Sequence, residues 1–315
     1  MEKVEGKVAF ITGGASGIGL GMAKAFSAKG MKIILADLRQ EALDEAMAYF
    51  REKNRPAHAI KLDVTDREAY AAAADEAEDQ FDKIHVLVNN AGVGTIGPMQ
   101  NATYKDWDFT VGVNLGGVIN GIVTILPRIL KHGEGGHVVS TSSTSGFFAV
   151  GMAGLYNTTK YAVAGMMETL ATDLQGTGVG ASVFFPGPVA TNLPFPSRST
   201  RPDHLKNEVE PQMPPPPREG EPGRPPFDQS VFMDPVEAGE RVLRGIMRND
   251  LFIMSHPEFR DGIIARNEAL LRSIPDEPPD EKRHKTLKHF GTLLYNPIYD
   301  GQTTPGAFKG TTDKD

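Results

Sequence analysis

The sequence contains no cysteine among its 315 residues. This absence excludes disulfide bonds, thiolate nucleophiles and cysteine-ligated metal sites, and it is compatible with a reducing compartment. The eight histidines are scattered, and no pair stands at ligand spacing with a carboxylate. We therefore expect a protein without a metal centre.

Basic residues are also in the minority, with 33 Lys and Arg against 40 Asp and Glu and a formal net charge of −7. An acidic chain argues against a nucleic acid or an anionic membrane as a partner. The first apolar run, Val8 to Thr12, is too short for a signal peptide, and we find no apolar stretch long enough to span a membrane. These features predict a cytoplasmic protein with no membrane partner.

Short apolar runs alternate with amphipathic stretches along the first part of the chain. We expect strands at 8–11, 32–36, 58–62, 85–88, 136–140 and 181–185, and helices at 19–29, 40–53, 67–81, 104–130 and 156–175. This alternation predicts an α/β fold, a Rossmann-type doubly wound parallel sheet with helices on both faces. Its ligand should lie beyond the carboxyl ends of the strands.

The pattern changes after residue 193, where eleven prolines fall between Pro194 and Pro226. Such a segment cannot form regular helix or a central strand. We therefore expect a dinucleotide-binding and catalytic core at 1–193 and a proline-rich substrate lid or insertion at 194–233. The C-terminal part of the same domain follows at 234–274, with a helix at 236–247, a strand at 251–254 and a helix at 258–271. A polar surface tail completes the chain at 275–315.

A glycine-rich loop, Thr12 to Gly19, follows the first predicted strand with the spacing G-x-x-x-G-x-G. Glycine at a strand-to-helix junction lets the backbone approach a pyrophosphate, and the helix N-terminus adds N–H donors and a positive dipole end. The simpler interpretation is an ordinary β–α turn. The position of the loop at the start of a βαβ unit favours the dinucleotide site.

The second predicted strand ends at Asp37. A carboxylate there can accept hydrogen bonds from the adenosine ribose and would repel a 2′-phosphate, which favours NAD over NADP. Arg39 complicates this prediction, because a guanidinium can pair with that phosphate. The alternative for Asp37 is a solvated loop acid.

Tyr156 and Lys160 are four residues apart on a predicted helix and share one face. A free phenol has a pKa near ~10, and a nearby ammonium stabilises the phenolate and lowers that pKa. A tuned tyrosine can take a proton during alcohol oxidation and return it during ketone reduction. Lys160 can also bind the ribose of a nicotinamide cofactor. Taken alone, a tyrosine and a lysine four residues apart are frequent on helix surfaces by chance, so the spacing by itself does not indicate catalysis.

Two further residues support that pair. Ser143 follows a predicted strand, and its hydroxyl can hold the substrate oxygen beside Tyr156. Asn114 lies in an apolar helix, where an amide needs hydrogen-bond partners. Either it is a core amide bonded to backbone, or it carries a proton relay from Lys160 through water.

These residues resemble the catalytic and cofactor motifs of the short-chain dehydrogenases/reductases, in the order of that family, over about Lys7 to Leu193. The matching motifs are Thr12–Gly19, Asp63-Val64, Asn89-Asn90-Ala91-Gly92, Asn114, Ser143, Tyr156-x-x-x-Lys160 and Pro186–Thr191. The resemblance implies a Rossmann-type sheet, an NAD(P) cofactor and a catalytic tetrad of Asn114, Ser143, Tyr156 and Lys160. It also implies a homodimer or homotetramer.

The resemblance implies a set of cofactor-binding residues as well. They are Gly13, Ser16, Gly17, Ile18, Gly19, Asp37, Arg39, Asp63, Val64, Asn90, Gly92, Tyr156, Lys160, Val189 and Thr191. Asp63 and Val64 would bracket the adenine, and Asn90 and Gly92 would line the cofactor cleft. Val189 and Thr191 would hold the nicotinamide carboxamide.

The chain is similar to a subgroup that resembles the Cα-dehydrogenases of lignin aryl-ether breakdown. The shared cues are Ile11–Gly19, Thr103-Tyr104-x-x-Trp107, Val118–Gly121 and His256-Pro257-Glu258. This similarity implies a bulky, apolar secondary alcohol such as a benzylic or aryl alcohol. Phe147, Phe148, Met152 and Phe195 either line an apolar pocket for it or belong to ordinary core and lid packing.

The predicted function is an NAD(P)-dependent oxidoreductase that interconverts a secondary alcohol and a ketone by hydride transfer. One alternative is a steroid or 3-oxoacyl thioester reductase. A thioester calls for a basic rim, and the lid holds, among its acids, Arg198, Arg201, Lys206, Arg218 and Arg224. The other alternative is a non-catalytic dinucleotide-binding or redox-sensing protein, which the intact tetrad disfavours.

Overall fold

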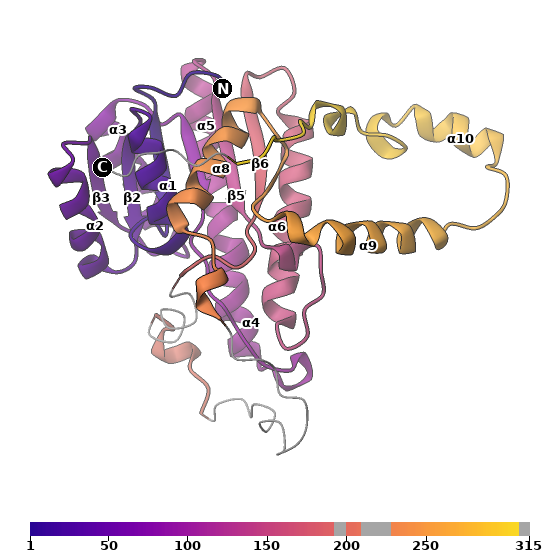
Figure 1. The fold of residues 1–315 in the computed structure, drawn as a ribbon, viewed down its shortest axis with the longest axis horizontal. Coiled ribbons are helices and arrows are strands. Elements are labelled where there is room, and N and C mark those ends of the chain that lie inside the picture. Colours follow the sequence, from indigo (N-terminus) through magenta and orange to yellow (C-terminus); the bar gives the residue numbers. More distant parts are fainter. Residues whose placement is uncertain (192–199, 209–227, 309–315) are drawn as a thin grey trace.

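The computed structural model describes residues 1–191, 200–208 and 228–308. At its centre lies a seven-stranded parallel sheet with the order β3-β2-β1-β4-β5-β6-β7 (Figure 1). The strands are β1 Val8–Thr12, β2 Lys32–Asp37, β3 Ala57–Lys61, β4 Val86–Asn89, β5 Gly136–Thr141, β6 Val179–Phe185 and β7 Phe252–Met254. The predicted doubly wound parallel sheet is confirmed.

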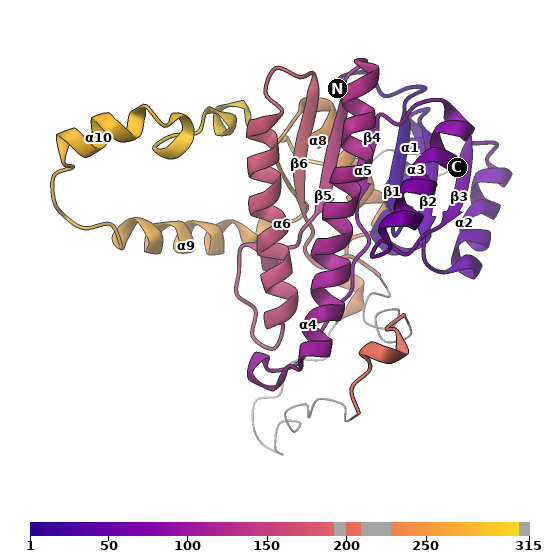
Figure 2. The ribbon, with the colours of Figure 1, turned by 180° about the vertical axis from the view of Figure 1, so that it is seen from behind.

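Helices cover both faces of this sheet (Figures 1 and 2). One layer contains α1 (Gly17–Ala28), α2 (Gln40–Glu52) and α8 (Pro235–Arg248), and the other contains α3 (Arg67–Phe81), α4 (Tyr104–Val111), α5 (Gly117–His132) and α6 (Gly154–Asp173). Alternate residues of β1 enter different cores: Ala9 and Ile11 pack beneath the first layer, and Val8 and Phe10 beneath the second. Apolar runs without alternation are typical of strands that are buried on both faces.

The helix expected at 104–130 continues to His132 and contains a π-helical segment, Gly112–Gly116, between α4 and α5. By length and composition, Tyr104–His132 is one helix that could cross a membrane, with a mean hydropathy of 1.7 in its most apolar window. The expectation that no such stretch exists was therefore wrong. Half of that window is buried inside the protein, and Val118, Ile125 and Ile129 belong to the core.

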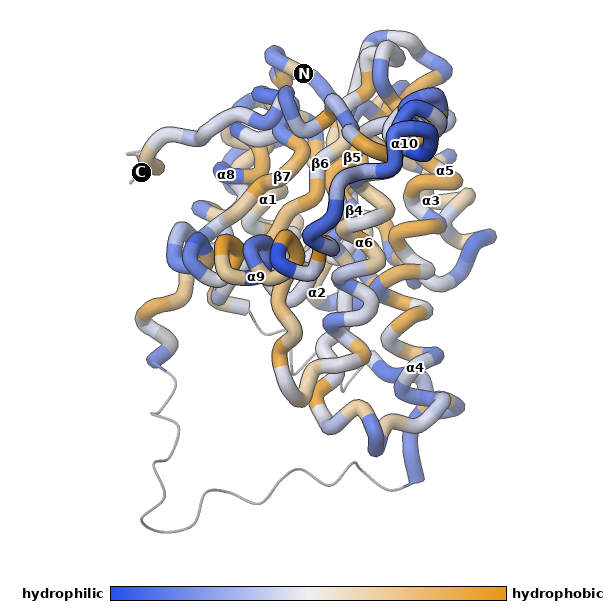
Figure 3. The backbone as a smooth tube through the Cα atoms, turned by 90° about the vertical axis from the view of Figure 1, so that its right-hand side faces the viewer, coloured by the Kyte–Doolittle hydropathy of each residue, from blue (hydrophilic) through white to orange (hydrophobic). Residues whose placement is uncertain are grey.

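The C-terminal region forms a projecting arm (Figures 1 and 2). Its helices are α9 (Arg260–Arg272) and α10 (Glu281–Lys288), and neither buries a residue. Figure 3 shows α10 as hydrophilic, and Phe290, Leu293 and Tyr295 are exposed beyond it.

The chain then returns to the body of the protein. Tyr299 Oη donates to Glu168 Oε2 at 2.6 Å, and Phe252 N donates to Gln302 Oε1 at 2.8 Å. Part of the proline-rich lid lies at 200–208 and 228–233, and the rest of it lies outside the described residues.

Candidate active site

A cavity of about 390 Å³ opens where the strands end, at the carboxyl edge of the sheet. Loops that follow β1, β2, β3, β4, β5 and β6 all contribute to its wall. The sequence-predicted residues on this wall are Gly13, Ser16, Gly17, Ile18, Asp37, Arg39, Asp63, Val64, Asn90, Gly92, Tyr156, Lys160 and Thr191. Residues from very different parts of the chain therefore meet at the place where a doubly wound sheet binds its ligand.

Four predicted residues do not form the wall. Gly19 lies under the glycine loop, where an added Cβ would come within 2.1 Å of Gly13 O, so its role is close packing. Val189 is buried and pairs with Met233 in an isolated bridge. Asn114 and Ser143 are buried and each bonds to a wall residue, Asn114 to Val93 and Ser143 to Tyr156.

The glycine loop has the backbone that a dinucleotide site needs. Gly13 and Gly17 have φ values of +61° and +51°, which side chains other than glycine rarely adopt. Asn90 Nδ2 supports the loop by donating to Thr12 O at 3.1 Å and to Gly13 O at 3.4 Å. Gly17 opens α1, so the N-terminus of that helix faces the cavity. These residues fit a bound pyrophosphate.

Asp37 is buried at the end of β2 rather than solvated. Its Oδ2 accepts a hydrogen bond from Ala15 N at 3.3 Å, and its Oδ1 accepts one from Arg39 N at 3.1 Å. Arg39 Nη2 in turn donates to Ser16 Oγ at 2.7 Å. The three side chains therefore form one polar corner of the cavity beside the glycine loop.

Tyr156 and Ser143 are brought together as the sequence predicts. The two hydroxyls share a hydrogen bond, which favours the phenolate, but burial raises the pKa of the Tyr156 phenol above its ordinary value. The expectation of a lowered pKa was therefore wrong for the protein alone. Lys160 Nζ lies 5.5 Å from the centroid of the Tyr156 ring.

Lys160 is itself an unusual group. It is buried, and its Nζ donates to Thr141 O at 2.8 Å. Burial lowers the pKa of Lys160 to about 8, because a desolvated ammonium is costly without an anionic partner. Near neutral pH this lysine can therefore exchange a proton, a property that an exposed lysine lacks.

Asn114 lies in the π-helical segment and is held entirely by protein groups. Its Oδ1 accepts from Val93 N at 2.7 Å, and its Nδ2 donates to Val93 O at 3.0 Å and to Thr159 Oγ1 at 3.2 Å. The amide needs no water to satisfy it. A Cβ added to Gly92 would stand 3.3 Å from Asn114 Oδ1 and 3.6 Å from Lys160 Nζ, so both residues border the space beside Gly92.

The comparison with known proteins decides the family. Residues 7–202 match the short chain dehydrogenase family. The chain is a short-chain dehydrogenase. This enzyme is 38% identical over 284 residues to a C alpha-dehydrogenase of Sphingobium sp. (strain NBRC 103272 / SYK-6), a match that covers 87% of this chain and 88% of the relative.

Solved structures agree with that assignment. The short-chain dehydrogenase is 36% identical to apo LigD from the same Sphingobium strain, with a TM-score of 0.72 and coverage of 87% of this chain and 99% of that one. It is 31% identical to a Burkholderia phymatum short chain dehydrogenase/reductase in complex with NAD, with a TM-score of 0.78 and coverage of 89% and 100%. It is therefore an alcohol dehydrogenase type oxidoreductase with a Rossmann fold that binds NAD(P).

Several residues on the wall of this dehydrogenase's cavity escaped prediction. Those from the strand ends and the loops beside them could have been found from the strand-end rule: Leu38, Leu62, Thr65, Val93, Thr141 and Ser142. Others come from α4 with its π-helical extension and from the lid: Asp108, Phe109, Gly112, Val113, Thr200, Pro202, His204 and Leu205. No local pattern marks the lid residues.

The aromatic residues considered for a substrate pocket lie elsewhere. The Phe147 ring packs on Phe185 with centroids 3.9 Å apart, and Phe148 lies 6.0 Å from Phe259. Neither of them, nor Met152, is on the cavity wall that the described residues form, and Phe195 lies outside those residues. For Phe147 and Phe148 the structure favours ordinary packing.

Proposed function

We propose that this enzyme interconverts a secondary alcohol and a ketone by NAD-dependent hydride transfer, with Tyr156 as the acid and base. One observation carries the proposal: Tyr156, bonded to Ser143, shares a single cavity with the glycine loop. A proton-transfer group and a dinucleotide cradle in one cavity are the two parts that alcohol oxidation requires.

The proposed cofactor is NAD rather than NADP. Asp37 stands at the end of β2 on the cavity wall, where its carboxylate can accept bonds from a ribose and would repel a phosphate. Arg39 is engaged by Asp37 and Ser16, so its positive charge is already shared. Bound here, the nicotinamide would supply the hydride acceptor.

The protein's own residues move the proton. In the oxidising direction, Tyr156 takes the proton from the substrate hydroxyl, and Ser143 holds the substrate oxygen in place. In the reducing direction the phenol gives the proton back. The raised pKa of Tyr156 keeps it protonated in the free enzyme, so it is prepared for reduction and must first lose its proton for oxidation.

We further propose that this proton leaves by way of Lys160 and the space beside Gly92. With a pKa of about 8, Lys160 is closely matched to a relay near neutral pH. Asn114, whose Oδ1 borders that space, is bonded to the Val93 backbone. A water placed there would be within reach of Lys160 Nζ, which supports the relay from Lys160 past Asn114.

The proposed substrate is a bulky, apolar secondary alcohol, with a benzylic or aryl alcohol as the first candidate. Its support is the relative named C alpha-dehydrogenase. A thioester is less well supported, because the basic residues of the described lid are engaged: Arg201 pairs with Asp106 at 2.7 Å and Lys206 with Asp203 at 2.6 Å.

A substrate panel tests the proposed function. Purified enzyme is mixed with NAD or NADP and with secondary aryl alcohols, steroids and 3-hydroxyacyl thioesters, and the absorbance of the reduced cofactor is followed. We expect the fastest turnover with aryl alcohols and NAD. Turnover of none of these alcohols with either cofactor, alongside tight NADH binding, would instead identify a dinucleotide-binding protein without chemistry.

The tyrosine is tested separately. Tyr156→Phe removes the acid and base but keeps the ring, so we expect turnover to fall by ~100-fold or more with little change in the Kd for NADH. If NADH binding is lost to the same degree, Tyr156 belongs to the binding site and its catalytic assignment is overturned.

We also propose that the enzyme forms a homodimer or homotetramer. Ile119, Val123 and Leu130 are exposed on α5, at spacings that place them near one another on the outer face. A contiguous apolar surface of this kind is covered in a symmetric oligomer. Light scattering after gel filtration measures the mass of the particle. We expect Val123→Glu to reduce it, and a monomeric wild-type enzyme would refute the proposal.

A further inference from the structure

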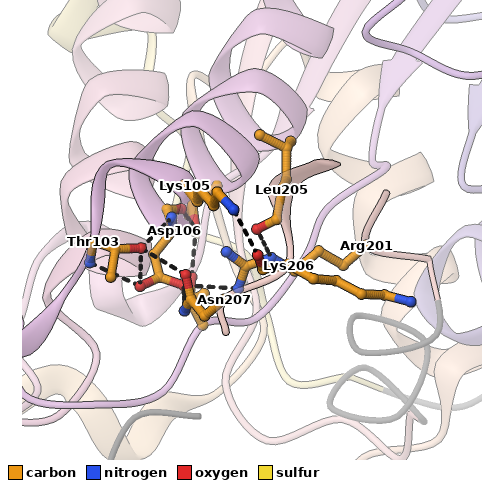
Figure 4. Close-up of polar contacts among 9 residues, drawn as sticks. Thr103, Lys105, Asp106, Arg201, Leu205, Lys206 and Asn207 are labelled. Atoms are coloured by element: carbon orange, nitrogen blue, oxygen red, sulfur yellow. Dashed lines mark hydrogen bonds and ion pairs between the residues drawn. The ribbon is translucent and has the colours of Figure 1, made fainter. Parts of the chain in front are cut away.

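Residues 200–208 of the lid lie against the N-terminal end of α4, as Figure 4 shows. Asp203–Leu205 form a 3-10 turn, in which Leu205 N donates to Pro202 O at 3.0 Å and Lys206 N donates to Asp203 O at 3.1 Å. Four residues of the segment, Thr200, Pro202, His204 and Leu205, line the cavity. The segment is therefore one wall of the active site, and something must hold it there.

Several hydrogen bonds attach the segment, and one carboxylate, Asp106, accepts two of them. Thr103 Oγ1 also donates to Asn207 Oδ1 at 2.8 Å, and Lys105 Nζ donates to Lys206 O at 3.0 Å. Asp106 Oδ1 accepts hydrogen bonds from Arg201 Nη1 at 2.7 Å and from Asn207 Nδ2 at 2.9 Å. Asp106 Oδ2 accepts from Thr103 N at 2.8 Å, which completes a capping box at the start of α4. Asp106 Oδ2 thus caps the N-terminus of α4, and Asp106 Oδ1 binds the lid segment to that helix.

Arg201 joins three parts of this wall. Its Nε donates to Leu205 O at 2.7 Å, which closes the segment on itself. Its guanidinium carbon lies 5.4 Å from the centroid of the Phe109 ring, within range of a cation–π contact. Phe109 lines the cavity one helical turn beyond Asp106, so a single side chain touches the segment, the cap and the cavity wall.

The ion pair between Arg201 and Asp106 is far more buried than the pair between Lys206 and Asp203 in the same segment. Arg201 and Asp106 keep only 15% and 6% of their side chains exposed, whereas Lys206 and Asp203 keep 55% and 94%. An exposed pair contributes little to structure. A buried pair is strongly destabilised when one partner is removed, because the other charge is then left uncompensated in the interior.

We propose that Arg201 is a positioning residue that fastens residues 200–208 to α4 and so completes the wall that bound cofactor and substrate meet. It acts through Leu205 and Phe109 rather than on the reacting atoms. Its loss should therefore weaken binding and spare the proton transfer at Tyr156. The kinetic consequence rests on the proposed function, and the structural consequence does not.

The test compares Arg201→Met with a matched control, Lys206→Met, in the full-length enzyme. Both variants remove one positive charge from the same segment and introduce the same side chain. Amide hydrogen exchange of a peptide covering 200–208 reads the attachment directly, and fluorescence titration with NADH reads binding without turnover. We expect exchange at least ~10-fold faster in Arg201→Met and unchanged in Lys206→Met.

The kinetic readout uses the best alcohol of the panel. In Arg201→Met we expect the Kd for NADH and the KM for the alcohol to rise at least about fivefold, with kcat within about twofold of wild type. Unchanged exchange would overturn the attachment. Faster exchange with unchanged Kd and KM would show that the segment is not a binding wall. A fall in kcat alone would place Arg201 in the chemical step.

A second variant guards against misfolding. Arg201→Met leaves the Asp106 carboxylate buried beside an apolar side chain, whereas Asp106→Asn with Arg201→Met removes both charges and keeps the capping shape. The double variant should fold and show the same faster exchange and weaker NADH binding. If wild-type enzyme oxidises no alcohol, the proposed function fails, but the exchange and NADH measurements still decide the role of Arg201.

Discussion

Two buried charged groups, Lys160 in the active site and Asp106 under the lid, differ in how the protein satisfies them. Asp106 is surrounded by donors. Burial alone would raise its pKa, but hydrogen bonds from Thr103, Arg201 and Asn207 outweigh burial and hold it below its ordinary value. Lys160 has a backbone carbonyl as its hydrogen-bond acceptor and no ion pair among the described residues, and its pKa falls to about 8.

The difference separates a structural charge from a reactive one. Donors that stabilise the ionised form make Asp106 a fixed anion at any physiological pH, which suits an attachment point. An ammonium that is stabilised too little gives up its proton easily, which suits a relay. The active site therefore keeps a group that costs folding free energy, and α4 keeps, beneath the lid, one that contributes to it.

The sharpest test of this contrast is Lys160→Met. Loss of the relay and of the ribose contact should reduce turnover by roughly 10²- to 10⁴-fold. The same change removes the cost of burying an ammonium, so the free energy of unfolding at neutral pH should rise by about 1–2 kcal/mol despite the lost bond to Thr141 O. Urea unfolding measures this, with the exposed Lys131→Met as the control. If Lys160→Met is less stable than the wild-type enzyme, Lys160 does not cost folding free energy and its contrast with Asp106 is wrong.

Asp106→Ala should act in the opposite direction. It removes the cap of α4 and leaves the Arg201 guanidinium buried without its anion, which should cost about 3–5 kcal/mol of stability. Asp203→Ala, in the exposed pair of the same segment, should change stability by no more than about 0.5 kcal/mol. Equal effects of the two variants on the urea midpoint would contradict the distinction drawn from burial.

The pH dependence of stability should also distinguish the two groups. The pKa of Lys160 is lowered from 10.5 to about 8 on folding, so its cost is fully present below pH 8. That cost fades as pH rises, because the native state loses the proton first. The advantage of Lys160→Met should therefore shrink between about pH 8 and 10.5. Asp106 has a depressed pKa, so its contribution should persist there and be lost only in acid.

The smallest expected effect concerns Gly92→Ala. The added Cβ would stand 3.3 Å from Asn114 Oδ1 and 3.6 Å from Lys160 Nζ, where it would fill the proposed relay space without a severe clash. Turnover should fall by about tenfold or less, while stability and the Kd for NADH should change little. Full activity of this variant would exclude the space beside Gly92 as the proton path.

Much of the fold follows from local pattern. Strands buried on both faces leave continuous apolar runs such as Val8 to Ile11, and β–α alternation then determines a parallel sheet. The cofactor residues follow because strand ends meet at one edge, so Gly13, Asp37 and Asn90 lie on one cavity. For these residues, knowing that each one follows a predicted strand is enough to predict that they meet.

Other features depend on contacts that no local pattern encodes. Arg201 is one of several basic residues in the lid sequence, and its pairing with Asp106 spans about a hundred residues. The raised pKa of Tyr156 depends on burial, which spacing from Lys160 does not reveal. The capping box of Thr103 and Asp106 is readable from sequence, but the second use of that carboxylate is not.

The arm that projects from the body has a consequence for how the chain can be divided. Both of its ends are fastened: Phe148 lies beside Phe259 at the outgoing end, and the returning end is held by Glu168 and by the backbone of β7. After a break in the turn between α9 and α10, the contacts of the returning end with Glu168 and β7 would still join the two fragments. The turn is therefore a natural point for splitting the enzyme into complementing halves or for inserting a foreign domain.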